Sequence, residues 1–473
     1  MKFVICVFFW SALLFGGVLC RRPVRGRRPS FENFSQSKIS ASLQQYIDGW
    51  EQQEQQEQQE QQEQQQEQQE QSVTQSQNRW DGSWFQQRPV GDDCVFGYDR
   101  VPKDHNKPLL LKSDKSGFLY PVEDGEDRLI GLRAGSSFTV ACPGERNKLF
   151  MNGWATATIT CKGGRFHYGR RTLTWENLGC ATKLSPTIRE TGTCGKGGTT
   201  ITIGWQLKSR VYLPEIELCF NKELETTLYS RHAVSGSHID HKTISPSRPS
   251  FKKAGMFSIS VQNSYRINTQ RSLMKELLAD PALITSRGQH YLARGHLTPD
   301  SDFVLEAEQD ATYYYANCVP QWQAINNGNW KSLENSVRDL AVDHKNTFDI
   351  WTGTHGVLEL PDARNRPVKL YLGLSQNRAI VPVPAYMWKV IHEPHTNRAV
   401  AIVMTNRVRE QGPLPLDSED LAPPCEDVCG WVSWVDWDVK DSSRGRTYCC
   451  FVDDLRASFE NVPDLGRVGL LSN

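Results

Sequence analysis

The segment that decides the fold runs from Tyr291 to Phe303 and reads YLARGHLTPDSDF. Arg294 and His296 stand two positions apart, so in an extended strand both side chains leave the same face. A guanidinium binds phosphate oxygens in a planar fork, and an imidazole can accept a proton from water near neutral pH. Gly295 between them permits close approach of a ligand or of another backbone. On its own, the segment also fits a turn that contains an incidental histidine.

A second segment, Asn317–Glu334, reads NCVPQWQAINNGNWKSLE. Periodicity over 327–343 predicts a helix, whose apolar stripe is Trp330, Leu333, Val337 and Leu340. Asn326 precedes the stripe by one turn and therefore needs a polar partner. That partner is either the amides of the helix N-terminus, which Asn caps well, or a hydrated Mg²⁺ ion. Glu334, about 80° further round an ideal helix, either reaches a metal-bound water or is an exposed charge.

Taken together, the two segments resemble the DNA/RNA non-specific endonucleases. This is a ββα-metal family that includes endonuclease G and bacterial extracellular nucleases, and the resemblance is particularly close to the secreted nucleases of arthropods. The family motif Asp-Arg-Gly-His appears here as Ala293-Arg-Gly-His296, so alanine replaces the aspartate. The second family block appears as Asn317-Cys-Val-Pro-Gln321, Asn326-Asn-Gly-Asn-Trp330 and Leu333-Glu334. Val381–Lys389 agrees further, and the resemblance covers roughly residues 205–460.

The resemblance implies a mechanism and a set of site residues. It implies one Mg²⁺ ion, with Mn²⁺ as a substitute, and hydrolysis of DNA and RNA without sequence specificity to leave 5′-phosphate ends. The implied roles are general base for His296, metal ligand for Asn326, phosphate binding for Arg294 and Arg266, and orientation of metal-bound water or support of the site for Glu334 and Asn317. Arg271 competes with Arg266 for the second phosphate-binding role. The missing aspartate at Ala293 bears on metal affinity.

The strand and helix patterns indicate an α+β fold with a central, largely antiparallel sheet and flanking helices. Strand-like runs include TTITIGWQL (199–207), RVYLPEIELCF (210–220), TFDIWTG (347–353) and AVAIVMT (399–405), with helical periodicity over 271–280 and 327–343. We expect this nuclease domain to span 205–460 and a tail to span 461–473. Before it, alternating runs at 137–142 and 155–161 predict a small, mostly β domain over 79–204.

The N-terminus predicts secretion. Residues 1–20 read as a signal peptide, because Lys2 precedes a short apolar run and small residues follow. A membrane anchor is the alternative, but the run is short for a span. Residues 21–78 form a basic leader and a linker that contains the Glu-Gln-Gln repeat of 51–71, which has no apolar stripe. We therefore expect an extracellular protein without a membrane anchor.

Cysteine usage agrees with secretion. Of the 13 cysteines, Cys6 and Cys20 lie in the predicted signal peptide, which leaves an odd number in the remaining chain. In an oxidising compartment these predict a disulfide framework with at least one unpaired or intermolecular cysteine. The pairing is not readable from the sequence. A zinc site at Cys425 and Cys429 is an alternative, although the adjacent pair Cys449-Cys450 does not suit tetrahedral coordination.

The net charge and its distribution bear on whether the chain binds nucleic acid. The chain has a formal net charge of +0, which argues against a purely electrostatic nucleic-acid binder. Residues 251–300 nevertheless hold seven Lys and Arg against three Asp and Glu, as a phosphate-tracking cleft requires. Two alternatives to the nuclease remain: a catalytically weak, nucleic-acid-sequestering member of the same fold, and an unrelated secreted disulfide-rich module. The oligomeric state is not readable.

Overall fold

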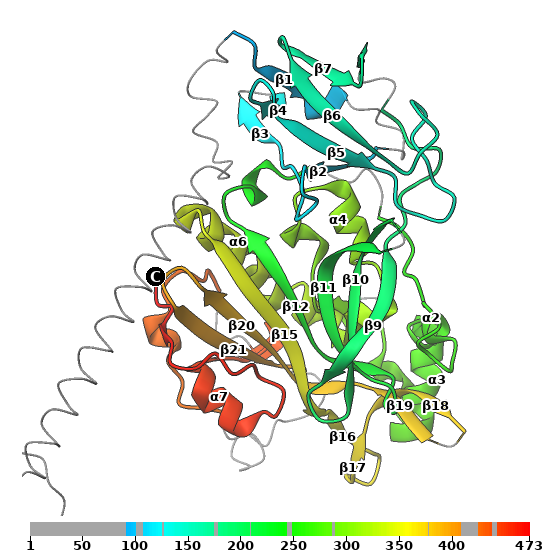
Figure 1. Cartoon of the computed structure of the whole chain (residues 1–473). Helices are drawn as coiled ribbons and strands as arrows, with labels where there is room; N and C mark the ends of the chain where they lie inside the picture. Colours follow the sequence, from blue (N-terminus) through cyan, green and yellow to red (C-terminus); the bar gives the residue numbers. More distant parts are fainter. Residues whose placement is uncertain are drawn as a thin grey trace, which may run out of the picture. The chain divides into compact units, whose positions relative to one another are not determined.

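An antiparallel sheet lies at the centre of the predicted nuclease domain (Figure 1). The computed structural model describes residues 91–473 except 101–106, 125–126, 175–177, 209, 244–247, 286–288, 377, 408–423 and 438–441. The predicted signal peptide, the basic leader and the Glu-Gln-Gln repeat lie outside the described residues. Among the helices of the described residues, none is long and apolar enough to cross a membrane.

The central sheet has the strand order β22-β21-β20-β15-β12-β11-β10-β9, and β23 pairs in parallel with β21. Its strands are β9 (Thr187–Cys194), β10 (Gly198–Lys208), β11 (Val211–Asn221), β12 (Thr226–Ser235), β15 (Thr347–Val357), β20 (Pro384–Glu393), β21 (Arg398–Thr405), β22 (Thr447–Cys450) and β23 (Gly469–Leu470). The four strand-like runs are thereby confirmed as β10, β11, β15 and β21. Because β9 and half of β10 precede residue 205, the sheet begins upstream of the expected start of the nuclease domain. The division into two domains stays a prediction.

Strand β21 shows why its sequence is apolar throughout rather than alternating. Val400, Ile402 and Met404 belong to the large core, whereas Ala399, Ala401 and Val403 belong to a second, smaller core. Successive side chains of a strand point to opposite faces, so a strand covered on both faces must be apolar at every position. Helix α6 (Asn329–His344) covers one face and α7 (Val452–Ser458) the other (Figure 1).

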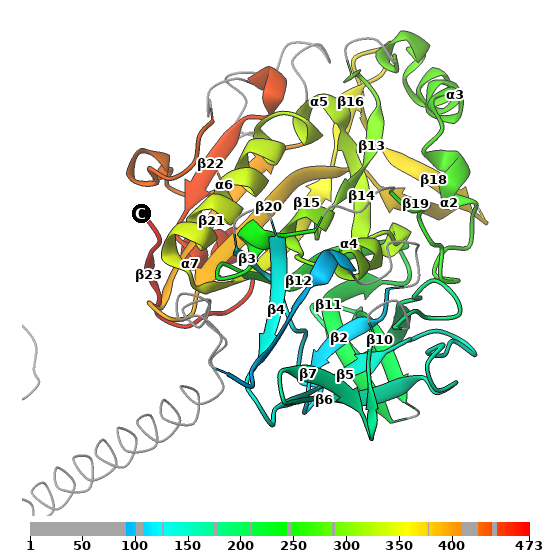
Figure 2. The ribbon, with the colours of Figure 1, turned by 90° about the horizontal axis from the view of Figure 1, so that it is seen from above.

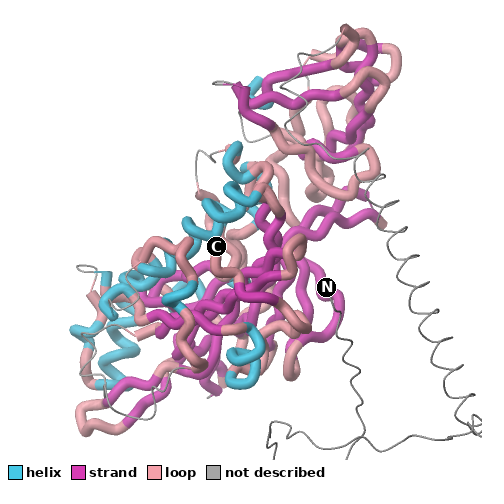
Figure 3. Tube along the Cα trace, turned by 90° about the vertical axis from the view of Figure 1, so that its left-hand side faces the viewer, coloured by secondary structure: helices cyan, strands magenta, loops and turns pink. Residues whose placement is uncertain are grey.

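The predicted helices form with small shifts in their bounds. The 327–343 pattern is α6, and all four residues of its stripe are buried. The 271–280 pattern is α3 (Ile267–Leu278), which ends at Ala279 in the left-handed conformation. Three short helices complete the set: α2 (Val261–Ser264), α4 (Glu306–Ala311) and α5 (Gln323–Asn326). Figure 3 shows most of these helical segments on one side of the strands.

A separate hairpin carries the two sequence motifs. Strand β13 (Leu292–His296) pairs antiparallel with β14 (Cys318–Trp322), and His296 lies opposite Cys318. Helix α5 follows β14 directly, and α6 follows α5 after Asn327 and Gly328. Two strands and a helix in this order form the ββα unit, so the α+β fold of the ββα-metal type is confirmed. Figure 2 shows β13 and β14 side by side, with α5 at the end of the hairpin.

Small sheets surround this framework. The hairpins β16 (Glu359–Pro361)–β17 (Pro367–Lys369) and β18 (Tyr371–Ser375)–β19 (Arg378–Pro382) extend from the nuclease region. The N-terminal strands form one sheet of β1 (Cys94–Gly97), β4 (Asp127–Leu132) and β3 (Val122–Asp124), and another of β2 (Leu109–Lys112), β5 (Ser137–Ala141), β6 (Thr156–Lys162), β7 (Arg165–Tyr168) and β8 (Arg171–Thr172). The strand-like runs at 137–142 and 155–161 are therefore confirmed as β5 and β6.

The disulfide framework is also confirmed. The described residues contain five disulfides: Cys94–Cys161, Cys142–Cys180, Cys194–Cys219, Cys425–Cys450 and Cys429–Cys449. The unpaired cysteine is Cys318, which is buried in β14. Because Cys425 and Cys429 are both oxidised, neither offers a thiolate, and the alternative of a zinc site there is wrong.

Candidate active site

A pocket of about 570 Å³ opens over the exposed face of the β13–β14 hairpin. Arg294 and His296 both line it, as the two-residue spacing predicts for a strand, and Asn326 at the end of α5 lines it as well. Its remaining walls come from the loop 248–251, α2 and the stretch that leads into β14. Side chains from both sequence motifs therefore meet in one cavity, although they lie 30 residues apart in the chain.

His296 lies between two aromatic rings at the floor of this pocket. Its ring centroid is 5.2 Å from that of Phe251 and 5.3 Å from that of Tyr313. Burial lowers the pKa of His296 from 6.5 to about 4, and the positive charges of Arg248 and Arg294 act in the same direction. The imidazole is therefore neutral at pH 7 and able to accept a proton. Its Nε2 atom is buried without a hydrogen-bond partner among the described residues.

Arg294 and Gly295 face opposite sides of strand β13. The Arg294 guanidinium lies over the rings of Phe251, at 5.1 Å, and Tyr265, at 5.8 Å, and the side chain is exposed to the pocket. Gly295 points the other way, into the protein, where a Cβ atom would lie 2.5 Å from the Gln321 side chain. The glycine thus accommodates a side chain of the neighbouring strand.

Asn326 does not cap a helix. It is the last residue of α5, whereas α6 begins two residues after Asn327 and has Gly328 at its N-cap. The Asn326 side chain is partly exposed to the pocket, and within the described part of the chain no hydrogen bond holds it. Of the two partners open to it in the sequence, the helix amides are thereby excluded. An amide oxygen without a partner fits the single protein ligand of a hydrated Mg²⁺ ion.

Asn317 is fully buried and supports the backbone just after His296. Its Oδ1 atom accepts from the Thr298 amide at 3.0 Å, and its Nδ2 atom donates to the carbonyl oxygens of Thr298 at 2.8 Å and Thr312 at 3.0 Å. The Leu297 amide donates to the Asn317 carbonyl at 3.0 Å. All of these partners are protein atoms, so the structure places Asn317 in a supporting position rather than in the pocket.

Thr298 connects this support to a buried polar network. Its hydroxyl lies 3.2 Å from Nδ1 of His232, whose Nε2 atom lies 2.8 Å from Asp302. Arg338 of α6 donates to the other oxygen of Asp302 at 2.7 Å. The neighbouring His232 and Arg338 lower the pKa of Asp302 to about 2, although burial acts in the opposite direction. The loop after the candidate base is thus anchored to the core by groups whose charges are paired.

Glu334 belongs to the surroundings of this network and is not among the residues that line the pocket. Burial raises its pKa to about 7, while the charge of the buried Lys389 opposes that rise. The break between α5 and α6 explains its position. The angle of about 80° between Asn326 and Glu334 assumes one continuous helix. It does not apply, because Asn326 belongs to α5 and Glu334 to α6. Glu334 is also only partly exposed, so it is not an ordinary surface charge.

Neither of the two arginines that the sequence offered for the second phosphate-binding role lines the pocket. Arg266 caps α3, is exposed and does not line the pocket, although its neighbour Tyr265 does. Arg271 is held by the Ile284 carbonyl at 2.9 Å. Arg248 is the arginine that joins Arg294 in the pocket lining. Arg248 is therefore a further candidate for this role, and the role of Arg266 stays a prediction.

Arg248 is 81% exposed and lies 3.7 Å from the Asp300 carboxylate. Asp300 also accepts from the Tyr313 hydroxyl at 2.6 Å, and its charge opposes the lowering of the His296 pKa. No local pattern marks Arg248 in the sequence, because it precedes Phe251 in an irregular loop. That loop reaches the site through a parallel bridge between Lys252 and Tyr314, a pairing across more than sixty residues.

Comparison with known proteins agrees with this geometry. Residues 196–455 match the DNA/RNA non-specific endonuclease family. The chain belongs to this family. Membership identifies the chain as a nuclease, a hydrolase that cleaves nucleic acid. The departure at Ala293 stays a feature of this member, and Ala293 is among the residues that line the pocket.

Relatives of this nuclease include proteins of insect saliva. A salivary endonuclease of Lutzomyia longipalpis is 28% identical over 367 residues, which cover 76% of this chain and 82% of that protein. A salivary endonuclease of Culex quinquefasciatus is 29% identical, with 75% and 85% covered. Salivary protein Tsal2A of Glossina morsitans morsitans is 24% identical, with 81% and 95% covered. The similarity thus extends beyond the nuclease region into the N-terminal part of the chain.

Proposed function

We propose that this nuclease hydrolyses internal phosphodiester bonds of both DNA and RNA, without sequence specificity, and that His296 is its general base. The observation that carries the proposal is the neutral His296 in a pocket that it shares with two arginines and the unpartnered Asn326. Neutral imidazole accepts a proton from water, while guanidinium groups bind the phosphate that the water attacks.

The chemistry starts from water positioned beside His296. Proton transfer to the imidazole creates the nucleophile at the moment of attack, and the resulting imidazolium lies near the Asp300 carboxylate, whose charge favours it. Arg294 and Arg248 hold non-bridging phosphate oxygens in line with the attack. Departure of the 3′ oxygen leaves a 5′-phosphate on the downstream fragment.

A divalent cation fits beside these groups. Asn326 would hold it through one side-chain oxygen, with water in the other positions, which suits Mg²⁺ and its substitute Mn²⁺. When bound, such an ion stabilises negative charge on the phosphate and on the leaving oxygen. Asn317 keeps the backbone around His296 in register, and Glu334 supports the site from the buried network behind it.

The described lining of the pocket suits the sugar-phosphate backbone. Arg294 and Arg248 can bind phosphate, and its aromatic rings, such as Tyr265 and Phe251, offer surfaces on which any base or sugar can rest. We therefore expect cleavage of single and double strands alike. The disulfides and the salivary relatives support secretion into the extracellular space.

The test uses the secreted protein and the variants His296→Ala and Asn326→Ala. Each is incubated with plasmid DNA and with total RNA, either with Mg²⁺ or with excess EDTA. His395→Ala and Asn268→Ala, which remove exposed side chains of the same types, serve as matched controls. We expect the wild type and both controls to degrade the two substrates with Mg²⁺ only, and both site variants to lose most activity while they remain folded.

Two results would count against the proposal. Wild-type-like cleavage by Asn326→Ala would exclude that residue as the metal ligand. Retardation of uncut nucleic acid by the wild type, with Mg²⁺ present, would favour the sequestering member of the fold, and restoring the family aspartate through Ala293→Asp would then be the next experiment.

A further inference from the structure

A second hollow of about 310 Å³ adjoins the active-site pocket. Asn327 lines both cavities, and its side chain donates to Gln289 at 2.9 Å. The second hollow is lined otherwise by the short helix α5, by Gly328 and by Ser443 and Arg444 from the C-terminal part of the chain. It therefore continues the pocket along the side on which Asn326 lies.

The C-terminal segment is held firmly against this hollow. A Cβ atom at Gly328 would lie 2.8 Å from the Arg444 carbonyl oxygen, so only glycine allows the two backbones to approach. Asn329 donates to the Gly445 carbonyl at 3.0 Å. Figure 2 shows α5, the first turn of α6 and β22 close together. The backbone of Arg444 thus has a fixed position beside the residue proposed to bind metal.

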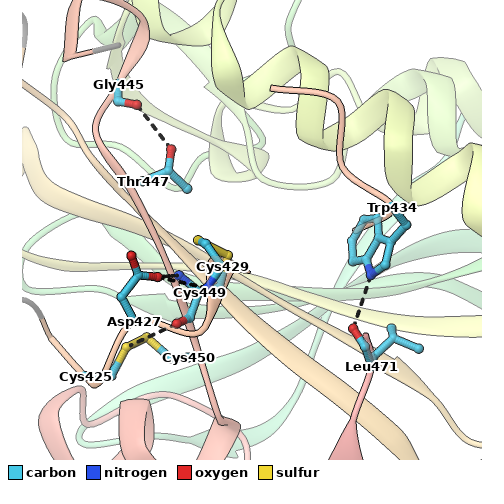
Figure 4. Close-up of a disulfide and its surroundings, with 9 residues drawn as sticks. All are labelled: Cys425, Asp427, Cys429, Trp434, Gly445, Thr447, Cys449, Cys450 and Leu471. Atoms are coloured by element: carbon cyan, nitrogen blue, oxygen red, sulfur yellow. Dashed lines mark hydrogen bonds between the residues drawn. A yellow bond between two sulfur atoms is a disulfide. The ribbon is translucent and has the colours of Figure 1, made fainter. Parts of the chain in front are cut away.

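Two disulfides fix the other end of the segment. Cys425–Cys450 and Cys429–Cys449 tie residues 425–429 to β22, which begins three residues after Arg444 (Figure 4). Asp427 lies between the two bridges and accepts from the Cys429 and Cys449 amides at 3.0 and 3.1 Å. An arginine presented from such a frame is positioned in advance, which reduces the entropy lost when a ligand binds it.

Charge distinguishes this hollow from a third one, which shares Arg248 and Tyr313 with the lining of the active-site pocket. That third cavity, of about 160 Å³, is lined by Lys242 and Arg248 and also by the carboxylates Asp300 and Asp310, which offset these cations. The lining of the second hollow contains no carboxylate among the described residues, and the exposed Arg444 has no ion-pair partner there. A polyanion that leaves the catalytic pocket therefore meets a cation without a neighbouring carboxylate in the described lining of the Arg444 hollow.

We infer that Arg444 and the hollow beside α5 form a subsite for the phosphate that neighbours the scissile one on the same nucleic-acid strand. The inference rests on the proposed function, since it takes the pocket of His296 as the place of cleavage. It assigns the disulfide-tied C-terminal segment a direct part in binding polymeric substrate. A substrate with a single phosphodiester has no second phosphate and would not use this subsite.

The experiment compares the wild type with Arg444→Ala, Arg444→Lys and the control Arg364→Ala, which removes an exposed arginine from the β16–β17 turn. Binding of a labelled 20-nucleotide DNA strand is followed by fluorescence anisotropy in EDTA at several salt concentrations. Cleavage of the same strand and of the dinucleotide TpT is followed with Mg²⁺. We expect Arg444→Ala to weaken binding roughly tenfold and to reduce the logarithmic salt slope by about one, with Lys restoring much of the affinity.

The same variant should raise KM for the long strand by a similar factor and leave TpT cleavage unchanged. Equal binding and equal salt slopes for Arg444→Ala and Arg364→Ala would overturn the subsite. So would an equal loss on TpT and on the long strand, because Arg444 would then act through α5 on the catalytic pocket. If no protein cleaves either substrate, the proposed function fails, while the anisotropy data still decide the subsite.

Discussion

Protonation of His296 should link the stability of the fold to its activity. Burial lowers the pKa of this ring from 6.5 to about 4, so between these values the unfolded chain binds a proton that the folded chain does not. The free energy of unfolding therefore falls as pH falls through this window. At about 1.4 kcal/mol for each pH unit, the contribution of His296 at pH 4 amounts to a loss of roughly 3 kcal/mol relative to pH 7.

The assay is urea unfolding of the wild type and of His296→Gln at pH 7 and at pH 4, with the exposed His395→Gln as control. Acidification should shift the stability difference between wild type and His296→Gln by roughly 3 kcal/mol in favour of the variant. In parallel, kcat/KM of the wild type should hold from pH 7 to about 5 and then fall, approaching tenfold per pH unit below about 4. Two results together would refute the argument that the ring is held buried and neutral. One is a fall of kcat/KM with its midpoint near the ordinary histidine pKa. The other is a stability difference between wild type and His296→Gln that is the same at pH 7 and pH 4.

Three further changes test the arrangement around the base. Arg248→Ala should lower kcat/KM on DNA at least tenfold, whereas Arg266→Ala should change it less than about threefold. Only Arg248 lines the pocket. Initial rates at subsaturating substrate measure both effects. Asn317→Ala leaves the buried Thr298 amide without its acceptor and should lower the free energy of unfolding by roughly 2–3 kcal/mol, measured by urea titration. Cys318 is buried and its pKa is raised by burial, so iodoacetamide should label it only after unfolding, as mass spectrometry of the intact protein would show.

The parts of the site that the sequence predicted are those that short-range patterns encode. Arg294 and His296 share a face because a strand alternates, and the stripe of α6 is buried because it repeats with the helical period. Both patterns need only a few neighbouring residues. The helix break before α6 was harder to predict. Asn326 fits a cap as well as a metal ligand, and Gly328 is required by close approach both of the Ala324 carbonyl oxygen and of Arg444.

What the sequence could not predict depends on contacts between distant segments. Arg248 enters the pocket because its loop pairs with the stretch before β14, and nothing in its immediate neighbours distinguishes it from Arg266. The disulfide pairing is equally non-local. Cys449 and Cys450 are adjacent, yet they bond to Cys429 and Cys425 respectively, on opposite faces of β22, since successive residues of a strand point in opposite directions.

The distribution of charge explains how a chain with no net charge can serve as a nuclease. Its buried charges, such as Asp302 with Arg338, pair with one another and fix the backbone that carries His296. Among its exposed cations, Arg294 stands on strand β13 and Arg444 on the disulfide-tied segment, in two adjoining hollows that share Asn327. Cations at these two hollows provide local attraction to phosphate although the chain as a whole carries no net charge.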